Sequence, residues 1–316
     1  MSTLSRPEFH DEAAAYAYVE ARIWPEGATC PKCGERDRVS KMGGKSTRIG
    51  TYKCYKCRKP FTVKVGTIFE ASHVPMNLWL QAIYLMCASK KGISSNQLHR
   101  TLGVTLKTAW FMSHRIREAM RSGDLSPFGS NGGAVEMDET FIGKEPGVTK
   151  APNARGGARK MKVLTLVDRE TKRARSIVVD DLEKSTLLPI LRENVAREAF
   201  ILTDEARQYQ GLAASPDFSG HDYVNHGAGE YVRRAAPEVH TNTVEGFYSV
   251  FKRGMKGVYQ HCGKRHLHRY AAEFDFRYSN RAGNGVDDAT RADAALTGVV
   301  WKRLTYRRTD EASIAV

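Results

Sequence analysis

Hydrophobic and polar residues alternate in three consecutive runs near the middle of the chain, at 134–143, 161–169 and 174–181. This alternation predicts strands, and their succession without an intervening helix pattern predicts an antiparallel meander. Residues 185–195, STLLPILRENV, place apolar side chains at helical spacing behind a capping serine. The apolar run AFILTDE at 199–205 predicts a buried strand that ends in acidic residues. The mixture of strands and helices predicts an α/β fold for this region.

Helical spacing of apolar residues dominates the rest of the chain. It covers residues 1–27, the stretch TNTVEGFYSVFKRG at 241–254 and the stretch that begins at Lys264. Between 75 and 122 the pattern predicts several helices, with a glycine at the turn before a helix capped by Thr105. A helix, a glycine-containing turn and a second helix are typical of a helix-turn-helix DNA-binding domain. The alternative is a plain helical hairpin with a basic, solvated face.

Four of the six cysteines form two CxxC pairs, Cys30 with Cys33 and Cys54 with Cys57. Four thiolates from two short turns can close a tetrahedron around Zn²⁺, which leaves no open position for chemistry. A redox-active CxxC is the weaker alternative, because a second matched pair is present and no thioredoxin-like βαβ unit surrounds either pair. We therefore predict a structural zinc ribbon over 28–70, whose basic surface could contact DNA or dock a protein.

The charge balance changes the expected partner. The chain carries 49 Lys and Arg against 35 Asp and Glu, a formal net charge of +14. Such an excess of positive charge favours nucleic acid as the binding partner, because each neutralised phosphate releases counterions. The alternative is a basic protein that binds no nucleic acid. The composition is that of a globular protein. We find no run of eighteen apolar residues and no N-terminal apolar core of signal-peptide type, so we expect a cytoplasmic protein.

Three acidic residues lie where a metal-dependent active site could form. Asp138 lies within a strand, where a charge is costly unless it is paired or metal-bound. Asp204 ends a buried strand, and Glu245 follows 41 residues later on a helix face. Carboxylate oxygens suit Mg²⁺ or Mn²⁺, and two such ions could clamp the attacking and leaving oxygens of a phosphoryl displacement. Each acid alone could be a cap or a solvated charge, and Glu136 and Glu230 are rival ligands.

Other polar residues adjoin these acids. Glu139 and Glu205 follow two of them directly, so their side chains should point the opposite way if the backbone is extended. His221, His226 and His240 lie before the third acid and could support the site. Lone histidines are more often structural, so none of them is assigned as a ligand.

Two groups of residues are candidates for DNA contact. In the helix after the glycine turn, the side chains that could face a groove are Lys107, Thr108, Trp110, His114 and Arg115. Lys252 lies seven residues after Glu245, two turns along the same helix face, and could hold a DNA phosphate beside the acids. It begins a stretch free of acidic residues that includes Arg253 and Lys256 and whose alternative role is a solvated helix face.

Several long motifs occur in one order: CPKCG…CYKC, LGVTLKTAWFMSHRIREAM, VEMDETFIG, ILTDEARQY, YVNHGAGEYV and HTNTVEGFYSVFKRGMKGVYQH. In these motifs the chain resembles the bacterial insertion-sequence transposases that join an N-terminal zinc ribbon to a DDE catalytic domain. The resemblance extends from about residue 15 to about 305. It implies an RNase H-like catalytic domain with Asp138 on its first strand, Asp204 on its fourth and Glu245 on a late helix.

The resemblance also implies a mechanism and partners. Water activated by bound Mg²⁺ or Mn²⁺ would cut at the 3′ ends of the element, and the freed 3′-OH would attack target DNA without a covalent protein intermediate. Lys252 matches a basic residue that such families place there. The expected partners are the terminal inverted repeats, target DNA and a second copy of the chain, as a homodimer or larger assembly, in association with the bacterial nucleoid. Two alternatives are a catalytically silent DNA-binding regulator and an RNase H-type repair nuclease without strand transfer.

The expected organisation has four parts. They are an N-terminal helix (1–27), a zinc ribbon (28–70), a helix-turn-helix DNA-binding domain (75–122) and an RNase H-like DDE transposase domain (134–305). The fold class that follows is α/β, with a mixed-sheet catalytic domain preceded by the ribbon and the helix-turn-helix.

Overall fold

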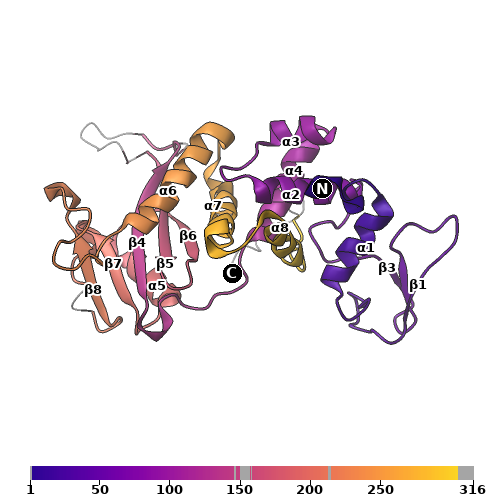
Figure 1. Cartoon of the computed structure of the whole chain (residues 1–316), viewed down its shortest axis with the longest axis horizontal. Helices are drawn as coiled ribbons and strands as arrows, with labels where there is room; N and C mark the ends of the chain where they lie inside the picture. Colours follow the sequence, from indigo (N-terminus) through magenta and orange to yellow (C-terminus); the bar gives the residue numbers. More distant parts are fainter. Residues whose placement is uncertain (1, 146, 150–156, 158, 213–214, 305–316) are drawn as a thin grey trace. The chain divides into compact units, whose positions relative to one another are not determined.

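A computed structural model describes residues 2–145, 147–149, 157, 159–212 and 215–304. These residues form two compact units (Figure 1). The first unit comprises 2–89, 93–121 and 287–304, and the second comprises 90–92 and 122–286. The chain therefore leaves the first unit after residue 121 and returns to it at residue 287.

The N-terminal part of the first unit combines one helix with a small sheet. Helix α1 (Glu12–Ile23) begins at Asp11, whose side chain accepts a hydrogen bond from the backbone N–H of Ala14. Strands β1 (Val39–Lys41), β2 (Tyr52–Cys54) and β3 (Pro60–Phe61) form an antiparallel sheet in that order. The sheet is too small to supply a core of its own, and a cluster of cysteines and aromatic side chains takes that place.

Four helices make up the rest of the first unit: α2 (Met76–Ala88), α3 (Ser95–Leu102), α4 (Leu106–Met120) and α8 (Asp288–Thr297). Helix α3 ends at Gly103, whose φ of 66° is the left-handed conformation that glycine adopts without steric cost. Thr105 then caps α4 by accepting a hydrogen bond from the backbone N–H of Thr108. The predicted turn and cap are thus confirmed. Helix α8 packs on α2 and α4 although it follows the whole second unit in the sequence.

The second unit is built on one mixed sheet of five strands in the order β6-β5-β4-β7-β8. The strands are β4 (Ala134–Ile142), β5 (Met161–Asp168), β6 (Ala174–Val179), β7 (Phe200–Asp204) and β8 (Gly220–Val224). The first three are antiparallel neighbours, as predicted, whereas β7 and β8 continue the sheet in parallel. The expected α/β fold class with a mixed sheet is therefore confirmed.

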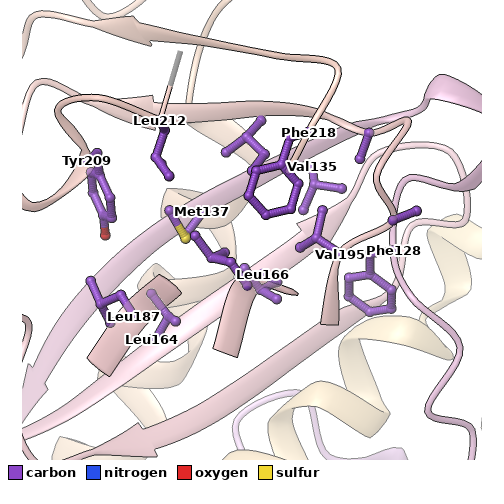
Figure 2. Packing of buried hydrophobic residues seen from close by; sticks show 14 of the residues in the cluster. Phe128, Val135, Met137, Leu164, Leu166, Leu187, Val195, Tyr209, Leu212 and Phe218 are labelled. Carbon is purple, nitrogen blue, oxygen red and sulfur yellow. The ribbon is translucent and has the colours of Figure 1, made fainter. Parts of the chain in front are cut away.

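Helices cover both faces of this sheet. Helix α5 (Lys184–Asn194) packs on one face over Val135, Met137 and Leu166 (Figure 2). Helices α6 (Asn242–Gly254) and α7 (Lys264–Ser279) pack on the other face, where Phe247 and Phe251 meet the opposite side of β5. Because side chains alternate along a strand, even-numbered residues of β4 before Thr140 face α6 and odd-numbered ones face α5.

Two local predictions were wrong or incomplete. Strand β8 was not predicted, because GHDYV holds a single aliphatic residue and its pairing with β7 is non-local. Helix α5 begins one residue before Ser185, and Glu183 at its N-cap makes no side-chain capping bond, so the predicted serine cap is absent. Among the described residues, no helix combines the length and apolar character needed to cross a membrane.

Candidate active site and zinc site

The sheet brings Asp138 and Asp204 to neighbouring strands. Strands β4 and β7 are parallel, with Ala134 opposite Phe200 and Glu136 opposite Leu202. Both pairs are 66 residues apart, which is also the separation of Asp138 and Asp204. The register therefore carries the two carboxylates to matching positions at the end of the paired region. Both side chains are partly buried.

Glu136 fixes the start of the helix that carries the third acid. Its side chain is fully buried, and one carboxylate oxygen accepts the backbone N–H groups of Thr243 and Val244, both at 2.9 Å. The other oxygen accepts a 2.6 Å hydrogen bond from Arg169 Nε. These two N–H groups belong to the first turn of α6, where backbone donors lack partners within the helix. Glu136 was a rival metal ligand by sequence, but here its two oxygens hold protein donors.

A second contact fixes α6 one turn further on. The Tyr248 hydroxyl donates to the carbonyl oxygen of Asp138 at 2.6 Å. Glu245 lies between this contact and the one made by Glu136, on the first turn of α6. Its carboxylate accepts a hydrogen bond from the Thr241 hydroxyl at 3.1 Å. Helix α6 is thus anchored to β4 on both sides of Glu245.

The electrostatics of this region show that the three acids interact. Burial, followed by the charges of Glu139, Asp204 and Glu245, raises the pKa of Asp138 to about 8. Burial is also the main cause that raises the pKa of Asp204. A cluster of half-buried carboxylates is unfavourable by itself, and a bound cation reverses that balance. The donor set therefore fits a hard divalent cation such as Mg²⁺ or Mn²⁺.

The three carboxylates do not close around a single point. Among the residues that the structure describes, only the four CxxC cysteines bring three or more potential ligand atoms within 4.8 Å of one another, and the three acids do not. Two cations about 3.5–4 Å apart need a more open set of ligands than one cation does. A pair of cations would not require Asp138, Asp204 and Glu245 to meet at one point.

The raised pKa of Asp138 predicts how stability depends on pH. Since the folded-state pKa of about 8 exceeds the ordinary value of 3.8, the folded state binds the proton more tightly than the unfolded state. Without divalent cations, the free energy of unfolding should therefore fall as pH rises from about 4 to about 8. We expect Asp138→Asn to raise the melting temperature above that range, measured with a chelator present. A lower melting temperature for the variant there would contradict this assignment.

His226 is the histidine that lies against the candidate acids. Its Nε2 atom is 3.2 Å from Glu245 Oε1 and 3.2 Å from the Thr241 hydroxyl. Its charge acts on Asp204 by lowering the pKa of that carboxyl, although burial outweighs this effect. Glu205 holds the backbone of this segment by accepting the N–H groups of His226 and Gly227, both at 2.9 Å. Sequence spacing could not identify this contact, because it joins a loop to a separate helix.

The remaining neighbours have other partners. Glu139 accepts hydrogen bonds from Tyr209 and Gln208 on the α5 side, so the predicted opposite orientation to Asp138 is confirmed. Glu230 accepts the backbone N–H of Asn225 at 3.1 Å. His221 bonds the Thr203 hydroxyl at 2.9 Å. The other histidine, His240, belongs to the Glu136 and Arg169 cluster.

The anchoring role of Glu136 can be tested by unfolding. Glu136→Ala leaves the Arg169 guanidinium and two α6 N–H groups without their acceptor, so we expect the free energy of unfolding to fall by about 3–5 kcal/mol. Glu136→Gln keeps an acceptor oxygen and should lose less. Urea denaturation measures both, with Glu183→Ala as the control, since Glu183 is exposed and makes no side-chain cap bond. If Glu136→Ala is as stable as wild type, Glu136 does not anchor α6.

The four predicted zinc ligands come together in the first unit. Their sulfur atoms lie within 4.8 Å of one another, with Cys30 Sγ 3.7 Å from Cys57 Sγ and Cys33 Sγ 3.6 Å from Cys54 Sγ. Cys30 and Cys54 are buried. Trp24 packs edge-on against two rings beside them, Tyr52 and Phe61. A thiolate tetrahedron closed in this way fits structural Zn²⁺.

The predicted DNA-contact residues of α4 divide into two groups. Lys107 is exposed, and Thr108 and Trp110 are partly exposed. His114 and Arg115 are buried, so the prediction that they face a groove was wrong. The Arg115 Nη1 atom donates to the carbonyl oxygens of Ile68 and Glu70, which fixes α4 to residues 68–70. Helical spacing alone does not show which basic residues a neighbouring segment covers.

Three basic residues at the end of α6 and directly after it are exposed. They are Lys252, Arg253 and Lys256. The Lys252 Nζ atom lies 5.6 Å from the ring centre of Tyr248, the residue that bonds the Asp138 backbone. A π-helical turn, Met255–Tyr259, follows directly on α6. Lys252 therefore lies on the same side of α6 as the contact with β4.

Comparison with known proteins identifies both parts of the chain. Residues 131–279 match the family described as the ISXO2-like transposase domain, and residues 10–60 match the transposase zinc-ribbon domain. An uncharacterised protein in transposable element ISH50 of Halobacterium salinarum is 29% identical over 267 residues, which cover 80% of this chain and 86% of that protein. An uncharacterised transposase-like protein of Haemophilus influenzae is 30% identical over 105 residues, covering 33% of this chain and 80% of that protein.

Solved structures give a more distant likeness. The chain is similar to the Mos1 strand transfer complex at 12% identity and a TM-score of 0.22, covering 66% of this chain and 78% of that one. It is similar to a simian T-cell lymphotropic virus intasome at 11% identity and a TM-score of 0.27, covering 56% and 63%. Scores this low do not support a structural argument, and the family matches carry the assignment.

Proposed function

Because the chain belongs to the insertion-sequence transposases that combine a zinc ribbon with a DDE catalytic domain, we propose that it cuts the ends of its element and joins them to target DNA. The observation that carries the proposal is the placement of Asp138 and Asp204 at matching positions of two parallel strands, with Glu245 on a helix anchored to one of these strands. A DNA-binding relic has no need to retain three interacting acids in a half-buried setting.

The acids and Lys252 have separate roles in this proposal. Asp138, Asp204 and Glu245 would hold Mg²⁺ or Mn²⁺. When bound, these cations activate the attacking oxygen and neutralise charge on the phosphate. In the first step, water attacks the phosphorus atom and the 3′ oxygen of the element leaves with a proton. In the second step, that 3′-OH attacks a phosphorus atom of the target, and the target strand's own 3′ oxygen leaves. Lys252 would hold a neighbouring phosphate in place during both steps.

The remaining parts would recognise DNA. The exposed and partly exposed residues of α4, Lys107, Thr108 and Trp110, are available for contact with the terminal repeats. The zinc ribbon, held by four cysteines, would add a basic surface, and Lys252, Arg253 and Lys256 would bind DNA near the acids. Bringing two element ends together requires at least two active sites, so we propose a homodimer or larger assembly that works on chromosomal DNA in the nucleoid.

The proposal is tested with duplex DNA that carries the terminal repeat flanking the coding region. The purified chain is incubated with this duplex in Mg²⁺, Mn²⁺ or a chelator, and a duplex with a scrambled repeat is the control. We expect metal-dependent nicks at the 3′ end of the element, followed by products joined to a second DNA. Binding without cleavage would favour the silent regulator. Cleavage that ignores the repeat and never joins strands would favour a repair nuclease.

A further inference from the structure

The loop at residues 225–240, between β8 and α6, is held in place along its length. Asn225 accepts the backbone N–H of Ala228, and Glu230 closes the same turn through the N–H of Asn225. At the far end, Val232 and His240 form a β-bridge. This 225–240 loop is therefore a fixed support for the side chains that it carries.

Tyr231 stands out among those side chains. It is 60% exposed, and its ring centre lies 5.1 Å from that of His226 with the planes tilted by 45°. The Nε2 atom of His226 is 3.2 Å from the Glu245 carboxylate. A single exposed tyrosine is ordinary on a protein surface. Tyr231 differs because one histidine alone separates its ring from a candidate active-site acid.

The distances match the spacing of a DNA strand. Successive nucleotides rise about 3.4 Å along one strand, so a ring placed one histidine away from Glu245 is within one or two nucleotides of a phosphate held there. Every base has a flat π-face, and exposed aromatic rings in nucleic-acid-binding proteins stack on it. Arg234, exposed on the same loop, supplies a positive charge for the backbone. A protein partner would gain less from a ring placed so close to the acids.

We propose that Tyr231, supported by His226, is a stacking platform for a nucleobase that adjoins the scissile phosphate. This inference rests on the proposed function, because it takes Glu245 to mark the position of that phosphate. In this proposal, the 225–240 loop selects DNA in which the base next to the cut is unpaired or easily unpaired. The hydroxyl of Tyr231 has no part in it, since stacking needs the ring alone.

The test is a double-mutant cycle between the ring and the base. Binding of the full chain to the element-end duplex is measured in Ca²⁺, with wild type, Tyr231→Ala and Tyr231→Phe. Each variant also binds duplexes in which one nucleotide at a time around the terminus is abasic. We expect Tyr231→Ala to weaken binding to intact DNA by about 5- to 100-fold. At one position, the abasic duplex should bind wild type and Tyr231→Ala equally, while Tyr231→Phe behaves as wild type.

Tyr223→Ala is the matched control. Tyr223 is 45% exposed on neighbouring β8, and its ring lies against His221 rather than His226. The platform is overturned if the effects of Tyr231→Ala and of base removal on binding are independent at every position. It is also overturned if Tyr223→Ala weakens DNA binding as much as Tyr231→Ala does. Light scattering tests a further alternative. If Tyr231→Ala changes the molar mass of the protein and shows no coupling to any base, the ring is a protein contact, and the platform is overturned. The cycle measures binding and needs no cleavage. If Tyr231 is coupled to one base but the protein never cuts DNA, the proposed function is refuted and the stacking platform stands.

Discussion

Replacing Glu245 by glutamine is expected to lower the rate of 3′-end cleavage by a factor on the order of 10²–10³ while DNA binding persists. Glutamine has the size of glutamate and can still accept the Thr241 hydroxyl bond, so α6 should keep its place. What it lacks is the negative charge that would hold a divalent cation opposite Asp138 and Asp204. Single-turnover cleavage of labelled element-end DNA in Mg²⁺ and Mn²⁺ measures the loss.

Two comparisons separate loss of the ligand from loss of the fold. Glu238→Gln is the matched control, because Glu238 is exposed on the 225–240 loop and contacts Arg169 through its backbone carbonyl. A thermal shift with added Mn²⁺ should stabilise wild type and this control more than Glu245→Gln. Equal cleavage by Glu245→Gln and wild type would move the third ligand elsewhere, with Glu230 the next candidate to test.

Removing zinc is expected to unfold the ribbon and leave the second unit intact. Structural Zn²⁺ binds with apparent free energies of about 10–16 kcal/mol, and a sheet of three short strands has no comparable source of stability. Cys54→Ser should therefore lose bound zinc and expose residues 31–60 to trypsin. Metal analysis and limited proteolysis measure these changes, and one zinc per chain is expected for wild type.

Cys262→Ser is the control for this substitution, because Cys262 lies in the second unit, outside the cysteine cluster. It should keep both zinc and protease resistance. Cys54→Ser should still nick DNA in a chelator-free metal buffer, although with weaker binding. Retention of zinc by Cys54→Ser would show that the four sulfur atoms are not the ligand set.

The pattern-based predictions succeeded where the signal is local. The meander at 134–181, helix α5 and helix α6 follow from alternation and helical spacing within a single segment. Strand β8 was missed because its pairing is with β7, and its five residues include a single aliphatic side chain. Local pattern decides an element when its buried face is continuous in sequence.

The site shows the same limit. Alternation along β4 places Glu136 on the same face as Asp138, which is why it was a rival ligand. Its partners, Arg169 and the first turn of α6, lie 33 and 107 residues further along the chain, and no spacing rule connects them. The burial of Arg115 is another non-local effect, since its guanidinium donates to the carbonyl oxygens of Ile68 and Glu70.

The return of the chain to the first unit at residue 287 affects the order in which the protein is completed during synthesis. Helix α8 packs on α2 and α4, and the Arg291 guanidinium donates to the Cys87 carbonyl oxygen of α2. The ribosome therefore finishes the whole second unit before it makes the helix that completes the first. A copy of the gene truncated after residue 286 would encode an intact five-stranded sheet, but α2 would expose the apolar face that α8 covers. Such remnants would fail first by aggregation of the first unit, not by unfolding of the second.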